Sequence, residues 1–193
     1  MKSKQHIFTG TETAMAYAIS AERLCENNTN FLKANPTCVP IFVSLLYQSL
    51  EISIKQAGID SGLFTLQEVL HRQYRSGHGI EEIAALAVEK LGGNNFEPVI
   101  MAMTFKNQKN NSAEIINQMI CGKKLKRTRE CYASRCLGYA QVSEGDFAII
   151  KPVKQWVDAV KETALNLPSA INVITQWKNT AKKSEHFLIW LNK

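Results

Sequence analysis

The sequence predicts a mainly α-helical protein, an antiparallel helical bundle with one small β-hairpin near residues 139–150. Apolar residues recur at the spacing of one helix face along most of the chain, whereas alternation with a period of two occurs only around that hairpin. The connections between the expected helices are short, which favours antiparallel neighbours. Of the 193 residues 45% are hydrophobic, and ten Gly and five Pro are too few for a disordered or collagen-like chain.

The first predicted helix begins with a capping box, Thr9-x-x-Glu12, and ends before Asn27. The second helix runs over residues 39–57 and takes Gly58 as its C-cap. Both of its opposite faces are apolar, so this helix either lies at the centre of the bundle or forms a dimer interface.

Two charged residues interrupt the apolar helix at 39–57. Glu51 and Lys55 stand four positions apart, with the acid first, which is the better orientation for an intrahelical ion pair. We expect that pair to be structural, although Glu51 could instead face a partner across a dimer seam.

Five further helices are predicted after residue 60. Residues 98–103 fit either a short helix or a strand, and both alternatives stay open. The five helices are expected to begin with the capping box Thr65-x-x-Glu68, at Ile80, after the pattern Asn111-x-x-Glu114, at Val153 behind Pro152, and beyond Pro168.

The length suits one domain with an appended element. We expect a helical domain over residues 1–166 and a C-terminal helical extension over residues 167–193 that packs on it. Residues 1–8 lack the apolar region of a secretory signal, and the longest apolar stretch, residues 38–47, is too short to cross a bilayer. The sequence therefore predicts a cytoplasmic protein without a membrane partner.

The five cysteines are odd in number and form no C-x-x-C pattern, so we expect reduced thiols. Cys131, Cys136 and His186 could be imagined as metal ligands, but a second closely spaced pair is missing. We therefore expect neither a metal nor a cofactor.

The net charge of +6 is concentrated in one segment, because residues 1–105, 106–135 and 136–193 carry net charges of −2, +6 and +2. Clustered bases beside an aromatic ring suit a phosphate backbone with a base stacked on the ring. A solvated basic loop after a helix C-terminus explains the same pattern, so both interpretations stay open. The candidate RNA-binding residues are Lys123, Lys124, Lys126, Arg127, Arg129, Tyr132 and Arg135.

A second candidate site lies between the third and fourth predicted helices. His78 stands between two glycines, where its imidazole is free to titrate near neutrality, and Arg72 lies six positions earlier. His78 could act as general acid or base on the ribose 2′-hydroxyl or the leaving 5′-oxygen, while Arg72 stabilises the charge on the phosphorane. Arg75 is a rival for the arginine role, and a helix-capping His78 is the structural alternative.

These residues resemble the HEPN superfamily of helical, RNA-associated domains. Arg72-x5-His78 falls within the Arg-x(4–6)-His pattern of its nuclease members, and residues 49–55 are similar to its leucine-glutamate-x-x-x-lysine stretch. The start of the following helix at residues 77–80 is also similar, and the resemblance covers roughly residues 12–165. Gln73 departs from the small polar or acidic residue that follows the arginine in active members.

The resemblance implies an RNA-binding protein, with metal-independent endoribonuclease activity in several members of the family. It also implies a homodimer through the helix at 39–57, with a site assembled from two copies. By the same resemblance, the chain could belong to a toxin–antitoxin or defence pair and bind an antitoxin or another protein.

The alternative is a non-catalytic interaction module that uses the region of Trp156, Trp177 and Trp190 as a docking surface. The apolar run at residues 187–191 must also dock on something to avoid being sticky. Other enzyme classes have little support, because the sequence contains no P-loop, no G-x-G-x-x-G, no H-E-x-x-H and no G-x-S-x-G.

Overall fold

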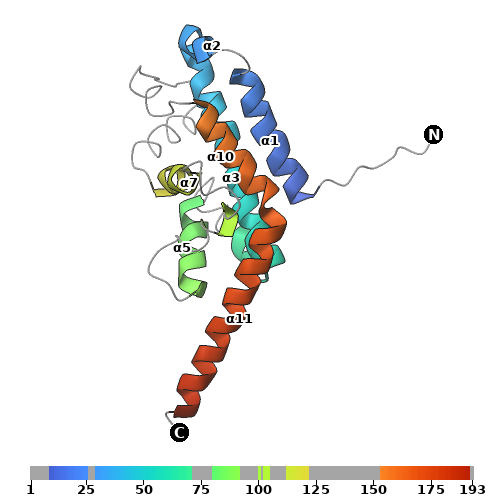
Figure 1. The fold of residues 1–193 in the computed structure, drawn as a ribbon, viewed down its shortest axis with the longest axis vertical. Helices are drawn as coiled ribbons and strands as arrows, with labels where there is room; N and C mark the ends of the chain where they lie inside the picture. Colours follow the sequence, from blue (N-terminus) through green and yellow to red (C-terminus); the bar gives the residue numbers. More distant parts are fainter. Residues whose placement is uncertain are drawn as a thin grey trace, which may run out of the picture.

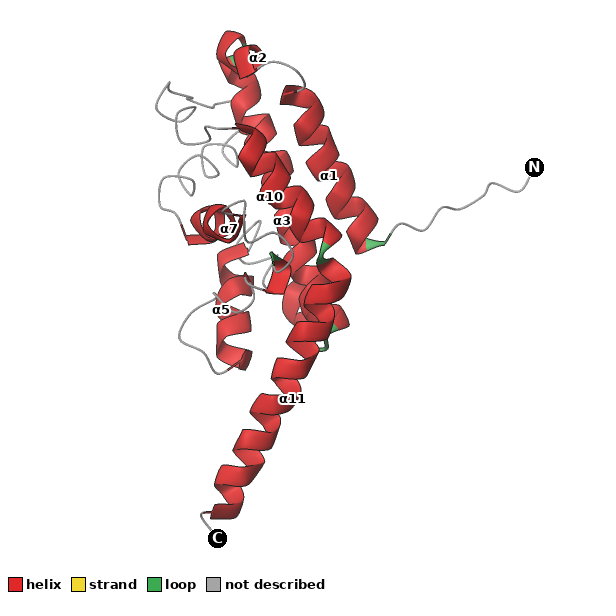
Figure 2. Cartoon of the chain, viewed as in Figure 1, coloured by secondary structure: helices red, strands yellow, loops and turns green. Residues whose placement is uncertain are grey.

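The computed structural model describes residues 9–25, 29–70, 80–91, 100, 102–104, 112–121 and 153–191. Within these ranges the chain is helical almost throughout and contains no strand (Figure 2). The predicted hairpin at 139–150 lies outside them. The bounded α-helices are α1 (Gly10–Cys25), α2 (Thr29–Ala34), α3 (Val39–Asp60), α5 (Ile80–Leu91), α7 (Ser112–Cys121), α10 (Val153–Leu165) and α11 (Leu167–Leu191), with a 3-10 turn at Pro36–Cys38.

Helix α3 lies at the centre of the bundle, with α1, α5, α10 and α11 packed around it (Figure 1). Phe42, Leu46, Leu50 and Ile54 on α3 are fully or almost fully buried. The central position is therefore confirmed, and it explains the two apolar faces of the helix without a second copy. The predicted dimer through residues 39–57 stays a prediction.

Helices α1 and α3 run antiparallel and approach closely. Ser49 Oγ on α3 donates a hydrogen bond to the Ala14 carbonyl on α1 at 2.7 Å, and Gly10 at the start of α1 lies against the Gln56 side chain. Ala14, Ala18 and Ala21 are fully buried on α1. Small residues at this contact let the two backbones approach closely, so the two helices pack tightly in this part of the bundle.

The end of α3 differs from the prediction. Gly58 does not cap the helix, which continues to Asp60 with Ser61 as C-cap. Gly58 is buried inside the helix because the ring of Phe64 packs on it: a Cβ there would stand 2.0 Å from a ring carbon. The residue with a left-handed backbone is Gly62, whose φ is +67°.

Three further segments refine the sequence-based picture. Helix α2 was not predicted. Ile100, Ala102 and Met103 are helical, and the Thr104 N–H donates to the Ile100 carbonyl at 3.0 Å, which supports the helical alternative for residues 98–103. No described helix has both the length and the apolar character needed to cross a bilayer.

Helix α11 starts directly after a one-residue break at Asn166, and Pro168 lies in its first turn, where a missing N–H is tolerated. Leu167, Ala170 and Ile174 are buried in the core of the bundle. The rest of α11 continues downward in Figure 1, past every other element that the structure describes.

Candidate functional site

The candidate catalytic residues Arg72, Arg75 and His78 lie outside the described residues, between two helical segments that the structure does describe. One is the helical stretch at 66–70 and the other is α5, which begins at Ile80. In the sequence, Arg72 follows the first segment by two residues and His78 precedes the second by two residues.

The helical stretch at 66–70 begins with the predicted capping box. Glu68 Oε2 accepts hydrogen bonds from the Thr65 N–H at 2.8 Å and from Thr65 Oγ1 at 2.9 Å. In return, the Glu68 N–H donates to Thr65 Oγ1 at 3.2 Å. Two backbone donors of the first turn are therefore satisfied locally, which fixes where this helix starts.

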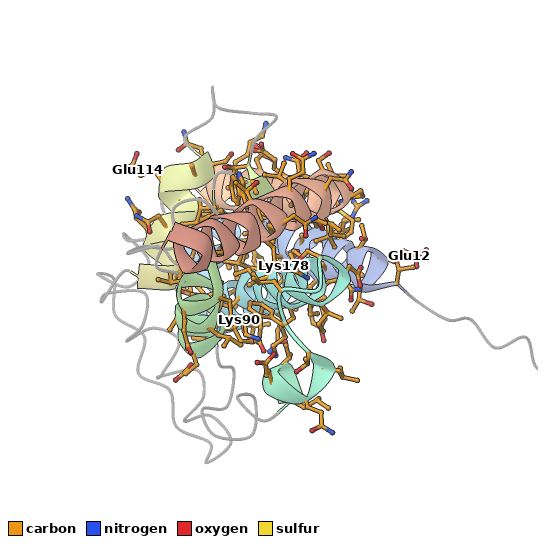
Figure 3. The ribbon with its side chains drawn as sticks, turned by 90° about the horizontal axis from the view of Figure 1, so that it is seen from below. Glu12, Lys90, Glu114 and Lys178 are labelled. Atoms are coloured by element: carbon orange, nitrogen blue, oxygen red, sulfur yellow. The ribbon has the colours of Figure 1, made fainter. Side chains whose placement is uncertain are left out.

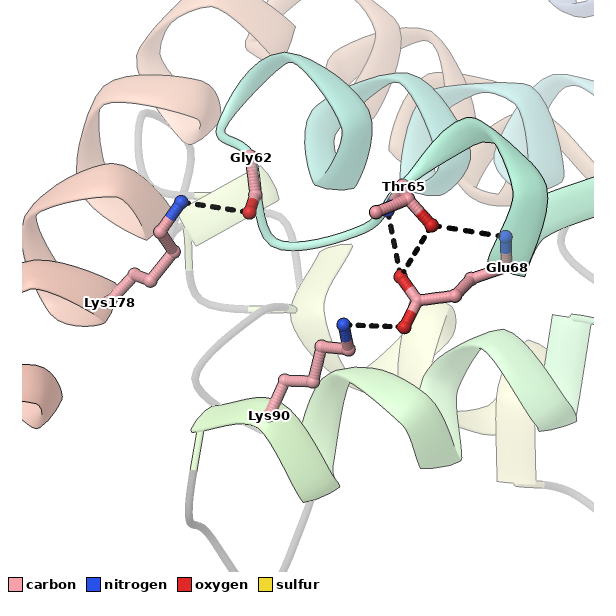
Figure 4. A network of polar contacts seen from close by, with 5 residues as sticks. All are labelled: Gly62, Thr65, Glu68, Lys90 and Lys178. Carbon is pink, nitrogen blue, oxygen red and sulfur yellow. Dashed lines mark hydrogen bonds and ion pairs between the residues drawn. The ribbon is translucent and has the colours of Figure 1, made fainter.

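Glu68 also ties this helix to α5. Lys90 Nζ lies 2.6 Å from Glu68 Oε1, the carboxylate oxygen that the capping box leaves available (Figure 4). The ammonium of Lys90, followed by the Thr65 N–H, lowers the pKa of Glu68 from 4.5 to about 2. Ile80 and Lys90 are separated by about 15 Å of helix, so the contact holds residues 66–70 near the C-terminal end of α5.

A second lysine holds the turn that precedes the capping box. Lys178 Nζ on α11 donates hydrogen bonds to the carbonyls of Gly62 at 2.8 Å and Ser61 at 3.2 Å. Lys178 thus holds the turn after α3 and Lys90 holds residues 66–70, as Figure 4 shows; Figure 3 labels both lysines within the whole bundle. A cation just beyond the C-terminus of α3 also complements the helix dipole.

The predicted pair on α3 is present. Lys55 Nζ binds Glu51 Oε1 within the helix, and both side chains are largely buried. Tyr47, one turn before Glu51, donates its hydroxyl to the Met119 carbonyl on α7 at 2.6 Å. This stretch of α3 therefore belongs to the interior of one chain, which agrees with the structural interpretation of Glu51.

A buried polar network that the sequence did not predict joins α7, α10 and the residues around Met103. Ser112 Oγ donates to Glu162 Oε2 at 2.6 Å, and Asn166 Nδ2 donates to the Met103 carbonyl at 3.2 Å. Ser112, Glu162 and Asn166 are each no more than 7% exposed. No signal in the sequence marks Glu162, because at 100° per residue it lies on the side of α10 opposite the apolar stripe that includes Val160 and Ala164.

The predicted RNA-binding residues Lys123, Lys124, Lys126, Arg127, Arg129, Tyr132 and Arg135 all lie outside the described residues. The described chain reaches this segment at Cys121, the last residue of α7, and resumes at Val153, the first residue of α10. Helices α7 and α10 pack on each other. In the sequence, the basic residues therefore lie between two helices that pack on each other.

The docking surface predicted around Trp156, Trp177 and Trp190 does not include Trp156, and the side chain of Trp190 lies outside the described residues. Trp156 is 4% exposed and belongs to the hydrophobic core, and Trp177 is partly buried against that core. Trp156 belongs to the apolar face of α10, and the bundle buries that face.

Among the described residues, Cys25 and Cys38 are free thiols. Burial raises the pKa of Cys25 to about 12, so this thiol stays protonated and behaves as a small apolar side chain. In the described ranges, no three His, Cys, Asp or Glu side chains come together as metal ligands could. Cys131 and Cys136 lie outside those ranges.

Comparison with known protein families, with curated proteins and with solved structures gave no match for this chain.

Proposed function

We propose that this protein binds RNA through the basic residues at 123–135, as an HEPN-like helical bundle. The observation that carries the proposal is the distribution of charge, since residues 106–135 hold a net +6 and the remainder of the chain is neutral overall. Phosphate groups are the usual partners of such a cluster, and Tyr132 offers a stacking surface for a base.

Four lysines of the described bundle support this proposal. Lys55 pairs with Glu51, Lys90 with Glu68, and Lys161 with Glu22 at 2.9 Å. Lys178 is engaged by the carbonyls at the end of α3. The bundle thus uses these four lysines internally, which favours the separate basic segment as the place where an external polyanion binds.

The second part of the proposal is metal-independent RNA cleavage by Arg72 and His78. His78 removes a proton from the ribose 2′-hydroxyl or donates one to the 5′-oxygen, and Arg72 stabilises the negative charge that builds on phosphorus. Arg75 competes for the role of Arg72. By resemblance to the HEPN superfamily, the protein would act within a toxin–antitoxin or defence pair, with an antitoxin as partner.

The test of cleavage uses labelled single-stranded RNA in the presence of EDTA. Wild-type protein is expected to cleave it, whereas Arg72→Ala and His78→Ala proteins are expected to lose at least about 100-fold in rate, the usual contribution of a general acid or base. His71→Ala is the matched control, because it removes a histidine next to Arg72 that has no proposed role. Arg75→Ala distinguishes the two arginines.

Cleavage that survives His78→Ala would exclude the proposed chemistry. Binding without cleavage in the wild type would retain RNA binding and favour the helix-capping role of His78. Absence of both would leave the interaction module as the function.

A further inference from the structure

Two free cysteines lie at the end of the bundle where α1 ends and α3 begins. Cys25 is the last residue of α1, and Cys38 is the N-cap of α3. Figure 1 shows α2 at this same end of the bundle, in the connection between the two helices. Both cysteines pack against the hydrophobic core while staying partly exposed, so small reagents in solution can reach them.

The register of α1 on α3 places the two cysteines at the same level. Ser49 Oγ on α3 donates a hydrogen bond to the Ala14 carbonyl on α1 at 2.7 Å. Cys25 follows Ala14 by eleven residues, and Cys38 precedes Ser49 by eleven residues. Eleven residues make about three helical turns and span about 16 Å. Because α1 and α3 are antiparallel, both cysteines lie at this distance from the hydrogen bond, toward the same end and on the faces that meet there.

Cys38 keeps this position although it stands just before α3. Its backbone is right-handed helical, with φ −81° and ψ −17°, and its N–H donates to the Asn35 carbonyl at 2.9 Å. Cys38 therefore continues the path of α3 by one residue, on the face that the helical spacing assigns to it.

The packing of α1 on α3 brings the facing backbones to the spacing of a disulfide. Ala14, Ala18 and Ala21 are fully buried on α1, and Gly10 lies against the Gln56 side chain at the other end of the contact. Helices that pack through small residues have axes about 8 Å apart. Since each Cα lies about 2.3 Å from its axis, Cα atoms on the facing sides are about 4–6 Å apart. A disulfide joins Cα atoms that are about 4.4–6.8 Å apart.

We propose that Cys25 and Cys38 are a redox modification site, at which a small disulfide oxidant such as glutathione disulfide joins them in an intramolecular disulfide. The Cys38 thiolate attacks one sulfur of the oxidant, which forms a mixed disulfide and releases one glutathione thiolate. The Cys25 thiol then loses its proton to solvent and attacks the Cys38 sulfur, which releases the second glutathione. Two protein thiols are oxidised, and one glutathione disulfide is reduced to two glutathione molecules.

The order of the two steps follows from the surroundings of Cys25. Burial raises its pKa to about 12, so Cys25 is almost entirely protonated near neutral pH and reacts second. Below that pKa the thiolate fraction rises about tenfold per pH unit, so conversion of the mixed disulfide should be about tenfold faster at pH 9 than at pH 8. Under reducing conditions both thiols stay free, in agreement with the expectation from the sequence.

The disulfide would close the connection over residues 26–37, which contains α2, and would tie the end of α1 to the start of α3. Neither cysteine takes part in the proposed RNA binding or cleavage. This inference therefore stands independently of the proposed function.

The test is peptide mapping of the full-length protein. Reduced protein is incubated with glutathione disulfide at pH 8 and pH 9, remaining thiols are blocked with N-ethylmaleimide under denaturing conditions, and the sample is digested with trypsin. Cleavage after Lys33 falls between the two cysteines, so residues 24–33 and 34–55 become separate peptides with one cysteine each. We expect these peptides joined, lighter by two hydrogens than the free pair, in protein that runs as a monomer on a non-reducing gel.

Cysteine variants separate the two steps. Cys25→Ser should stop at the mixed disulfide of Cys38 with glutathione, and Cys38→Ser should leave Cys25 blocked by N-ethylmaleimide. Cys121→Ser is the matched control, because it removes a cysteine from α7 instead, and it should leave the joined peptides unchanged.

Wild-type protein that carries only mixed disulfides, or no modification at all, would overturn the proposal. Joining of either peptide to one that contains Cys121, Cys131 or Cys136 would overturn it as well. Joined peptides found only in a covalent dimer would contradict the facing positions of the two cysteines within one chain.

Discussion

Glu68 shows how one side chain connects local and tertiary structure. One of its carboxylate oxygens completes the capping box with Thr65, and the other binds Lys90 on α5. The capping box could be predicted from the sequence because its partners are three residues apart. The ion pair could not, because the neighbouring helix that supplies Lys90 is fixed only by packing.

The Glu68 contacts predict a specific dependence of stability on pH. The pKa of Glu68 is lowered to about 2 in the folded protein from 4.5, so the stabilisation is complete above pH 4.5 and is lost as the pH falls toward 2. Glu68→Gln keeps an amide oxygen for the capping box but removes the charge. We expect it to lose about 0.5 kcal/mol near neutral pH, since the pair is partly exposed and screened.

The measurement is urea denaturation of wild-type and Glu68→Gln proteins between pH 2 and pH 7. Their free energies of unfolding should converge as the pH falls below 4. Glu12→Gln is the matched control, because Glu12 forms the same kind of capping box with Thr9 and no described ion pair with another helix. A difference that is independent of pH would contradict the assignment of the ion pair.

At the scale of the element, the helical spacing of apolar residues predicted most of the helices in the part of the chain that the structure describes. The starts of α1, α5 and α10 agree with their predicted positions because caps and apolar stripes are local signals. The end of α3 did not agree. Glycine near the end of a helical pattern usually indicates a C-cap, whereas Gly58 is required by the ring of Phe64, which returns to the helix from six residues later.

Gly58→Ala tests that explanation. Alanine at a helical position normally stabilises by up to about 1 kcal/mol, but the new methyl group would overlap the Phe64 ring. We expect a net loss of ~1–3 kcal/mol, which is typical of overpacking in a core. Thermal or urea denaturation gives the value.

The companion variant is Phe64→Leu, alone and combined with Gly58→Ala. The double variant should be more stable than the sum of the two single losses predicts, because the smaller side chain relieves the overlap. Additive losses would show that Gly58 is required for another reason.

At the scale of the whole molecule, the sequence predicted the helical class and the central helix, because both follow from the apolar pattern. It did not predict how polar groups pair across the bundle. Ser112 with Glu162 and Lys178 with Gly62 are 50 and 116 residues apart, and such contacts depend on the packing of whole helices. The same limit explains why Trp156 suggested a docking surface although the bundle buries it.

At the scale of the whole molecule, the distribution of charge supports the proposal that the protein binds RNA. A bundle that pairs Lys55, Lys90 and Lys161 with its own carboxylates and carries a separate segment of net +6 should bind RNA with a strong dependence on salt. Lys124, Arg127 and Arg129 lie at the centre of that segment. Replacing each with glutamine removes three positive charges without adding negative ones.

The most direct test is the affinity for labelled single-stranded RNA, measured by fluorescence anisotropy over a range of salt concentrations. Each phosphate contact contributes about 0.7 to the slope of log K against log salt, so the triple glutamine variant should lower the magnitude of the slope by ~2. Lys154→Gln, an exposed lysine on α10, should leave it unchanged. A wild type that does not bind RNA, or a triple variant with an unchanged slope, would contradict the account.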